Sequence, residues 1–416
     1  MASDESPEEL FAEREKRFND VIALRKPDRI PVLVLFTLFT AKYAGIPFDE
    51  DMGHAEKCME GNFITNMAFQ PDLASPTLFF GPMLAAVDFK QLKWPGHGLP
   101  PDSSYQFVEG EYMNPDEYDH YLFDPTDFMI RRYWPRVMGK LGAFQQLQPL
   151  HQIISHYMGV NMGFLPFGLP EVGQALEAMK KAGEETLAAL PHIVGNLERL
   201  KAAGLPTYFA SATQAPFDTI GDYFRGTKGL MIDMYRRPDK VVKMCEKLLP
   251  IMLDYGIGGC RATGVPRINI PLHKGSEGFM SQEQFKRFYW PTLRELLIGL
   301  IKAGIVPVVW FQGEYTSRLE IIKDIPPGAA LYWFESVDPV KAKKILKETV
   351  AIKGLFPMSL LVTGTTADVK SCCKKLIDTL GRDGGYVMGP AAGSLEDAKI
   401  ENVRAMFEFT REYGVY

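Results

Sequence analysis

From residue 204 onward, the chain alternates short apolar segments with long amphipathic ones. In most cases a glycine ends the amphipathic segment and a run of Val, Ile and aromatic residues follows, which is typical of a capped helix that leads into a buried strand. This alternation predicts strand–helix units in a parallel sheet. Six strands are expected, at 207–212, 267–273, 305–311, 330–335, 350–356 and 386–390.

Two further strands are expected earlier in the chain, at 31–36 and within 72–80. Six and two make eight, the number that closes an α/β barrel, and right-handed crossovers leave few other topologies. We therefore predict a (β/α)8 TIM barrel over residues 29–416, preceded by an N-terminal helical extension at residues 1–28. Residues 94–206 are expected to form an insertion, or lid, near the barrel mouth. An open doubly wound sheet is the competing architecture.

Composition and charge limit the classes of function. A net charge of −5 gives no electrostatic reason to bind nucleic acid. The longest apolar run, residues 30–41, is shorter than the roughly 20 residues that a membrane helix needs, and the acidic N-terminus does not resemble a signal peptide. Five cysteines without paired spacing argue against a disulfide framework. We expect a cytoplasmic enzyme that acts on a small molecule.

Catalytic groups of an α/β barrel lie just after the strands. His273, Glu314 and Glu335 are in such positions, and each could act as a general acid or base. Together they could also bind a divalent metal such as zinc. A structural role, such as a helix cap or a salt bridge, is equally open for each of them. The candidate substrate-binding residues at the same end are Gln214, Asp218, Trp310, Phe311 and Gln312, although core packing could equally explain the aromatic ones.

Several segments resemble a known family. They are DRIPVLVLF (28–36), ATQAPFDTIGDYFRG (212–226), MSQEQFKRFYWPTLRELLIGLIKAGIVPVVWF (280–311) and a tail that begins GLFPMSLLVTGTTADV (354–369). In order and spacing, the chain from about residue 17 resembles the uroporphyrinogen decarboxylase superfamily. The resemblance implies a (β/α)8 barrel and one of two activities, which are decarboxylation of a tetrapyrrole and transfer of a methyl group to or from a corrinoid or a thiol.

Two departures from the family's motifs separate these activities. The decarboxylases carry R-Q-A-G-R-Y after the first strand, whereas residues 36–45 contain Lys42 as their only cation. A polycarboxylate would therefore lack its bidentate arginine ligands. The thiol methyltransferases carry a zinc site of one His and two Cys, and the matching positions here are Trp310, Gln312 and Ala392. The resemblance is thus to the branch of corrinoid-dependent methyltransferases.

From this resemblance we expect an O-demethylase component of anaerobic one-carbon metabolism. It would transfer a methyl group from a small methoxylated (O-methyl) compound to the Co(I) corrinoid (cobalamin) of a separate partner protein, because the chain has no D-x-H-x-x-G cobalamin motif. One alternative is a decarboxylase or lyase of a small carboxylic acid, with Arg225 as a carboxylate ligand and with Arg318 more simply explained as a helix-surface residue. Another is a non-catalytic binder of a tetrapyrrole or a corrinoid protein. The methyl donor, the direction of transfer, a bound metal and a homodimeric state stay open.

Overall fold

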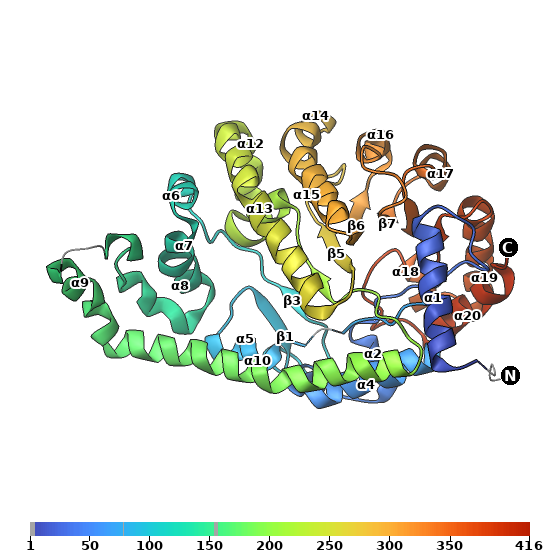
Figure 1. The fold of residues 1–416 in the computed structure, drawn as a ribbon, viewed down its shortest axis with the longest axis horizontal. Coiled ribbons are helices and arrows are strands. Elements are labelled where there is room, and N and C mark those ends of the chain that lie inside the picture. Colours follow the sequence, from blue (N-terminus) through green and yellow to red (C-terminus); the bar gives the residue numbers. More distant parts are fainter. Residues whose placement is uncertain (1–4, 78, 154–156) are drawn as a thin grey trace.

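Six parallel strands form the central sheet and lie side by side in chain order (Figure 1). The computed structural model describes residues 5–77, 79–153 and 157–416. Each pair of neighbouring strands is hydrogen-bonded in parallel register. All six strands expected in the second half of the chain are present, and the first, the fifth and the last of them are clearly shorter than expected. They are β4 (Ser211–Ala212), β5 (Arg267–Leu272), β6 (Val306–Glu314), β7 (Leu331–Ser336), β8 (Ala351–Gly354) and β9 (Tyr386–Val387).

Residues 30–34 close one edge of this sheet, beside β9. Val32 forms a parallel bridge with Met388. The amide of Leu33 donates a hydrogen bond to the Met388 carbonyl at 2.9 Å, and the amide of Met388 donates to the Pro31 carbonyl at 2.9 Å. The strand expected at 31–36 is therefore present as a short pairing.

Residues 72–75 close the other edge, beside β4. Ala74 forms a parallel bridge with Thr207. The amide of Asp72 donates to the Val32 carbonyl at 3.2 Å, which joins the two early segments to each other. Eight extended segments thus form a closed ring, and the expected (β/α)8 barrel is confirmed.

Helices alternate with the strands and cover the outside of the barrel. The one expected from about Met231 to Tyr255 is two helices, because Arg237 leaves the helical region with φ −140° and Pro238 starts a new helix. No described helix is both long and apolar enough to cross a membrane. The helices of this part are α11 (Pro216–Thr219), α12 (Gly226–Arg236), α13 (Pro238–Thr263), α14 (Gln282–Gln284), α15 (Trp290–Lys302), α16 (Leu319–Ile322), α17 (Pro339–Leu346), α18 (Met358–Val362), α19 (Thr366–Leu376) and α20 (Ile400–Tyr413).

The residues before β4 add a second group of helices. In Figure 1, α6 to α9 stand at one end of the molecule, and the long α10 runs from them towards α1 and α4. A lid function for residues 94–206 remains a prediction. The elements of this part are α1 (Pro7–Ile22), α2 (Phe39–Ala44), α3 (Phe48–Gly53), α4 (Ala55–Phe69), α5 (Gly81–Val87), β1 (Leu92–Pro95), β2 (Gly98–Leu99), β3 (Gln106–Phe107), α6 (Tyr118–Phe123), α7 (Pro125–Phe128), α8 (Trp134–Val137), α9 (Tyr157–Phe164) and α10 (Pro170–Ala202).

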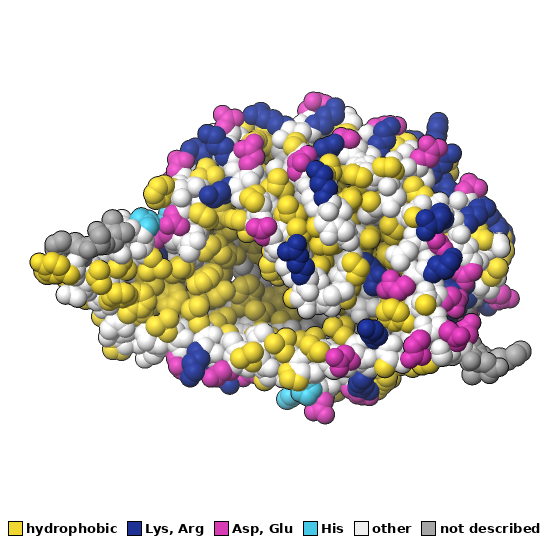
Figure 2. Space-filling view, viewed as in Figure 1, with side chains coloured by type: hydrophobic (Ala, Val, Ile, Leu, Met, Phe, Trp, Pro, Cys, Tyr) yellow, Lys and Arg dark blue, Asp and Glu magenta, His cyan; other side chains and the backbone are white. Residues whose placement is uncertain are grey.

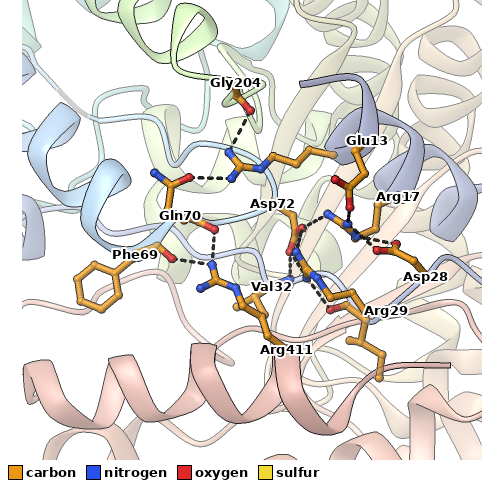
Figure 3. Close-up of polar contacts among 12 residues, drawn as sticks. Glu13, Arg17, Asp28, Arg29, Val32, Phe69, Gln70, Asp72, Gly204 and Arg411 are labelled. Carbon is orange, nitrogen blue, oxygen red and sulfur yellow. Dashed lines mark hydrogen bonds and ion pairs between the residues drawn. The ribbon is translucent and has the colours of Figure 1, made fainter. Parts of the chain in front are cut away.

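A buried ion network fastens α1 to the first two strand segments (Figure 3). Arg17 of α1 binds Asp72 at 2.7 Å and Asp28 at 2.6 Å, and Arg29 binds Asp72 at 2.7 Å. Asp72 also accepts the amide of Val32 at 2.7 Å. Burial alone would raise the pKa of Asp72, but the two arginines and this amide outweigh burial and hold it below its usual value. The carboxylate stays charged and joins three elements.

The interior of the barrel contains stacked indoles and a buried amine. The rings of Trp310 and Trp333 stack with centroids 4.4 Å apart. Lys353 of β8 lies with Nζ 3.3 Å from the centroid of the Trp333 ring, and it is fully buried. No described residue forms a hydrogen bond with this Nζ, and burial lowers the pKa of Lys353 well below its usual range. Burial therefore favours the neutral form of this amine in the folded chain.

The substitution Lys353→Met should stabilise the protein. Between the lowered pKa of Lys353 in the folded chain and the ordinary lysine pKa of about 10.4, the unfolded chain binds more protons than the folded chain, so stability should rise with pH across that interval. Methionine fills similar space without a titratable group. Thermal unfolding from pH 7 to pH 10 should show a melting temperature about 2–4 °C higher at pH 7 and a flatter dependence on pH. The same change at the exposed Lys370 should have neither effect, and a lower melting temperature for Lys353→Met would contradict the neutral amine.

Candidate active site at the carboxyl ends of the strands

Two cavities meet where β4 and β5 end. The larger has a volume of about 1390 Å³ and reaches Asn269, Trp310 and Gln312 inside the barrel; we call it the barrel cavity. The smaller, of about 650 Å³, lies between α13 and the segment of α6 to α8; we call it the side cavity. His273 and Tyr223 line both. Figure 2 shows a wide hollow with mostly hydrophobic walls above α10 on this face of the molecule.

His273 and Asp222 form a close pair at the junction of the cavities. His273 directly follows β5, and Asp222 lies in a π-helical turn that continues α11. The His273 Nδ1 lies 2.5 Å from the Asp222 carboxylate. Gln214 Nε2 donates to the same carboxylate oxygen at 2.5 Å. Because Nδ1 is engaged, Nε2 is the ring nitrogen available to a molecule in the cavities, and no described residue is hydrogen-bonded to it.

Asp218 holds the backbone at the end of β5. Its buried carboxylate accepts the amides of His273 at 3.0 Å and Lys274 at 2.9 Å, and the hydroxyl of Tyr289 at 2.6 Å. Burial, with the neighbouring charge of Asp222, raises the pKa of Asp218 above its ordinary value. Asp218 lines neither cavity, and its contacts position His273. A contact of Asp218 with substrate remains a prediction.

The carboxylates around His273 favour its protonated form. Burial alone would lower the pKa of His273, but the hydrogen bond with Asp222 and the charges of Asp222 and Asp218 outweigh burial and raise the pKa above its ordinary value. A histidine whose orientation is fixed by a carboxylate and whose other nitrogen faces a cavity can donate or accept a proton there. This arrangement is suited to general acid catalysis near neutral pH.

Lys274 is the only lysine or arginine among the described residues that line the two cavities. Its Nζ lies 3.3 Å from Asp222 and 3.3 Å from Glu109, and it donates to the Thr227 hydroxyl at 2.7 Å. Two carboxylates therefore balance this single positive charge. Among the described residues, no lysine or arginine of the lining is left without a carboxylate partner, and the His273 ring is itself paired with Asp222.

Glu314 and Glu335 lie outside both cavities. The register of β6 shifts between Phe311 and Glu314, and the Glu314 carboxylate accepts the amide of Thr316 at 2.9 Å and the hydroxyl of Ser336 at 2.5 Å. Glu335 accepts the amide of Gly313 at 2.6 Å. Both acids thus join the ends of β6 and β7, and Glu314 also holds the turn after β6. A catalytic role for them remains a prediction.

The metal set His273, Glu314 and Glu335 does not fit the arrangement that the structure gives these residues. Among the described residues, no group of three His, Cys, Asp or Glu side chains could hold a metal ion. Glu314 is engaged by Thr316 and Ser336, and Glu335 by the amide of Gly313. His273 is instead paired with Asp222. We therefore assign no metal to this site.

The other expected substrate-binding residues divide between cavity and core. Trp310 and Gln312 line the barrel cavity, and Gln214 lines the side cavity. Phe311 is fully buried in the layer between strands and helices, where it packs against Phe334 with centroids 4.9 Å apart. Successive residues of a strand point to opposite faces, so Trp310 and Phe311 cannot both face the cavity.

Sequence reasoning missed several residues of the site. Asp222 is four residues after Asp218, a spacing that puts both carboxylates on one side of a helix. This four-residue spacing could have identified Asp222 from the sequence. Lys274 directly follows the candidate His273 and could have been found from that position. Tyr255 of α13 lines both cavities, but nothing in the local sequence distinguishes it.

Neither candidate arginine lines the cavities. Arg225 binds Asp233 at 2.6 Å. Arg318, expected on a helix surface, is instead buried, and it donates to the Met280 carbonyl at 2.6 Å. Lys42 donates to the carbonyls of Glu396 and Ala398. These cations hold the chain together instead of converging on a ligand.

Comparisons with known proteins relate the chain to a family and a fold. Residues 152–413 match the family model described as Uroporphyrinogen decarboxylase (URO-D). Uroporphyrinogen decarboxylase of Koribacter versatilis (strain Ellin345) is 23% identical over 245 residues, which span 59% of this chain and 65% of that protein, slightly less than two thirds of its length. A methyltransferase from Methanosarcina mazei superposes with a TM-score of 0.62 at 14% identity over 96% of this chain and 98% of that one. At this identity, the likeness to the methyltransferase shows a shared fold.

The substitution Asp222→Asn should lower the pKa of His273. It removes the charge that outweighs burial, so the imidazole should lose its proton at lower pH than in the unchanged protein. NMR titration of the histidine side chains, with His273 assigned by its absence in a His273→Gln variant, measures this directly. Asp254 is exposed and lines the barrel cavity, so Asp254→Asn is a matched control that should leave the titration almost unchanged. An unchanged His273 titration in Asp222→Asn would refute the pairing.

Proposed function

Because the chain belongs to the uroporphyrinogen decarboxylase (URO-D) family, we propose that it is a methyltransferase of that family that removes the methyl group of a small methoxylated compound. The acceptor is the Co(I) corrinoid of a separate partner protein. The observation that carries this proposal is the His273–Asp222 pair at the junction of two largely apolar, cation-poor cavities. Such a site is suited to an uncharged substrate that needs a proton donor.

Cleavage of a methyl ether is limited by its leaving group. When the bond between the methyl carbon and oxygen breaks, the electron pair stays on oxygen, and a proton on that oxygen converts a poor leaving group into a neutral hydroxyl compound. His273 supplies this proton from Nε2, while Asp222 keeps hold of Nδ1. A positioned general acid contributes roughly 10²–10⁴-fold to such a rate.

The remaining residues of the site orient His273 and Asp222 or line the cavities around them. Asp218 fixes the backbone of His273, and Gln214 fixes the Asp222 carboxylate. Trp310 and Gln312 line the barrel cavity and would contact the reacting molecules. Phe311 supports the wall from behind, because it packs in the outer layer.

In this proposal the barrel cavity receives the macrocycle that the partner protein carries. Its walls include Ile193 and Leu197 of α10 and the small residues Gly258 and Ala262 of α13, and it opens onto the wide hollow of Figure 2. When bound, the partner's reduced corrinoid supplies the nucleophile that accepts the methyl group. The chain's own residues then need to bind the donor, exclude water and deliver one proton.

Decarboxylation of an acidic substrate is the second candidate, because a curated relative carries that activity in its name. A substrate with several carboxylates requires several cations at close range. The described lining offers only Lys274 and His273, and both are already paired with carboxylates of the protein. This observation favours the methyltransferase. A non-catalytic binder is disfavoured because His273, Asp222 and Lys274 place titratable groups at the cavity junction.

The substitution His273→Gln should lower the rate of methyl transfer by about 10²–10⁴-fold, because glutamine cannot donate the proton. An anaerobic assay with reduced cobalamin and a panel of methyl ethers, followed by absorbance and by appearance of the hydroxyl product, measures it. His192 on α10 is exposed, and His192→Gln is the matched control with an unchanged rate.

The same assay separates the candidate acids. Glu314→Gln and Glu335→Gln should cost much less than His273→Gln, because both carboxylates lie outside the cavities. If either glutamate variant lost as much activity as His273→Gln, that glutamate would be the general acid instead of His273. Carbon dioxide release from an acidic substrate, without methyl transfer from any ether, would replace the proposed function by decarboxylation.

A further inference from the structure

Residues 109–113, which we call the strap, pack on the helical turn that carries Asp222. The amides of Tyr112 and Met113 both donate to the Phe224 carbonyl at 2.8 Å. The strap belongs to the expected insertion, whereas Asp222 and Phe224 belong to the barrel. Two hydrogen bonds to one carbonyl therefore fix part of the insertion beside the site.

Glu109 is the strap residue that reaches the site. Its carboxylate accepts the amide of Thr227 at 2.6 Å and the hydroxyl of Thr227 at 2.7 Å, and it lies 3.3 Å from the Lys274 Nζ. Burial alone would raise the pKa of Glu109, but the hydrogen bonds from Thr227 and the charge of Lys274 outweigh burial and hold it below its ordinary value. The carboxylate is therefore charged at neutral pH.

Lys274 lies between Glu109 and Asp222. Its side chain is 9% exposed, and its Nζ lies 3.3 Å from a carboxylate oxygen of each acid. The Asp222 oxygen nearest to Lys274 is Oδ1, whereas Oδ2 is paired with the His273 Nδ1 at 2.5 Å. The ammonium and the imidazole thus share one carboxylate.

This sharing weakens the effect of Asp222 on the imidazole. Burial and the charge of Lys274 both lower the pKa of His273, and the hydrogen bond and charge of Asp222, with the charge of Asp218, outweigh them. Glu109 gives the ammonium a second carboxylate and so keeps Lys274 from fully neutralising Asp222. Without Glu109, Asp222 would be the only acid beside Lys274, and His273 would be a weaker base.

The other titratable groups around His273 are tyrosines and one exposed acid, namely Tyr223, Tyr255, Tyr289 and Asp254. Burial raises the pKa of Tyr223 to about 12 and that of Tyr289 well above its ordinary value, so both keep their protons. Within the described lining, Lys274 is thus the one lysine or arginine beside the pair. Glu109 is the residue through which the insertion acts on it.

We propose that Glu109 is a positioning residue that the insertion contributes to the site. By holding Lys274, it keeps the Asp222 carboxylate available to orient His273 and to favour its protonated form. The purpose of this arrangement rests on the proposed function, since a general acid must hold its proton until the leaving oxygen takes it. The docked strap then links the insertion to the protonation of His273.

NMR titration of His273 in the full chain, without corrinoid or substrate, tests the proposal. Glu109→Gln should lower the titration midpoint of His273 by roughly 0.2–0.7 pH unit, the size that a partly exposed charge pair supports. Glu109→Asp keeps the charge and should restore most of the original midpoint. An unchanged or higher midpoint in Glu109→Gln would overturn the proposal.

Glu111→Gln is the matched control. Glu111 belongs to the same strap, and its side chain is 51% exposed against 42% for Glu109, but it pairs with Arg225 at 3.3 Å instead of Lys274. Its loss should leave the titration of His273 almost unchanged. An equal shift in both variants would mean that Glu109 only holds the strap in place, and the proposal would be rejected.

Combined variants test the route through Lys274. Lys274→Met should raise the midpoint of His273, because it removes the opposing charge. In the Lys274→Met background, Glu109→Gln should have little further effect, since its action passes through the ammonium. A full additional shift in the double variant would contradict the positioning role.

Methyl transfer measured against pH separates this proposal from the proposed function. The rate should fall as the pH rises through the titration of His273, and in Glu109→Gln this fall should occur at lower pH. If the titration shifts as expected but no ether is demethylated, the proposed function fails and the role of Glu109 stands. If ethers are demethylated but the midpoint of His273 does not respond to Glu109→Gln, the proposed function stands and the role of Glu109 fails.

Discussion

The buried carboxylate of Asp72 is the contact on which closure of the barrel depends. The two N-terminal segments of the ring pair with their neighbours through isolated bridges, so regular ladder hydrogen bonds hold them only weakly. Asp72 compensates by binding Arg17, Arg29 and the amide of Val32 (Figure 3). Removing one partner of such a buried group costs about 3–5 kcal/mol. The same network brings α1 over the amino-terminal end, which leaves the opposite end free for chemistry.

At that opposite end, one short helical segment organises the site. Asp218 and Asp222 are one helical turn apart, and the first holds the backbone of His273 while the second holds its ring. The hydrogen bond with Asp222 and the charges of Asp222 and Asp218 raise the pKa of His273, and the charge of Lys274 opposes this rise. Because both acids come from the same turn, the orientation of His273 depends on local geometry more than on the distant parts of the chain.

The sequence was sufficient for the barrel and for part of the site. Glycine-led runs such as 305–311 are strongly patterned, and His273 is recognisable because it ends a strand. Glu314 and Glu335 end strands as well, but the shifted register of β6 and the nearby amides and hydroxyls, which no periodicity reveals, engage them outside both cavities. Asp222 was missed because it lies on a helical turn and not at a strand end.

The aromatic wall of the side cavity was beyond sequence reasoning for a different reason. Tyr121, Tyr133 and Trp134 belong to the region 94–206, whose irregular pattern fixes no orientation relative to the barrel. That wall also carries an optical consequence. Trp134 lines the side cavity and Trp310 lines the barrel cavity. Each cavity therefore contains its own tryptophan. In a variant that keeps Trp134 as its single tryptophan, fluorescence would report binding in the side cavity, and in one that keeps only Trp310 it would report binding in the barrel cavity.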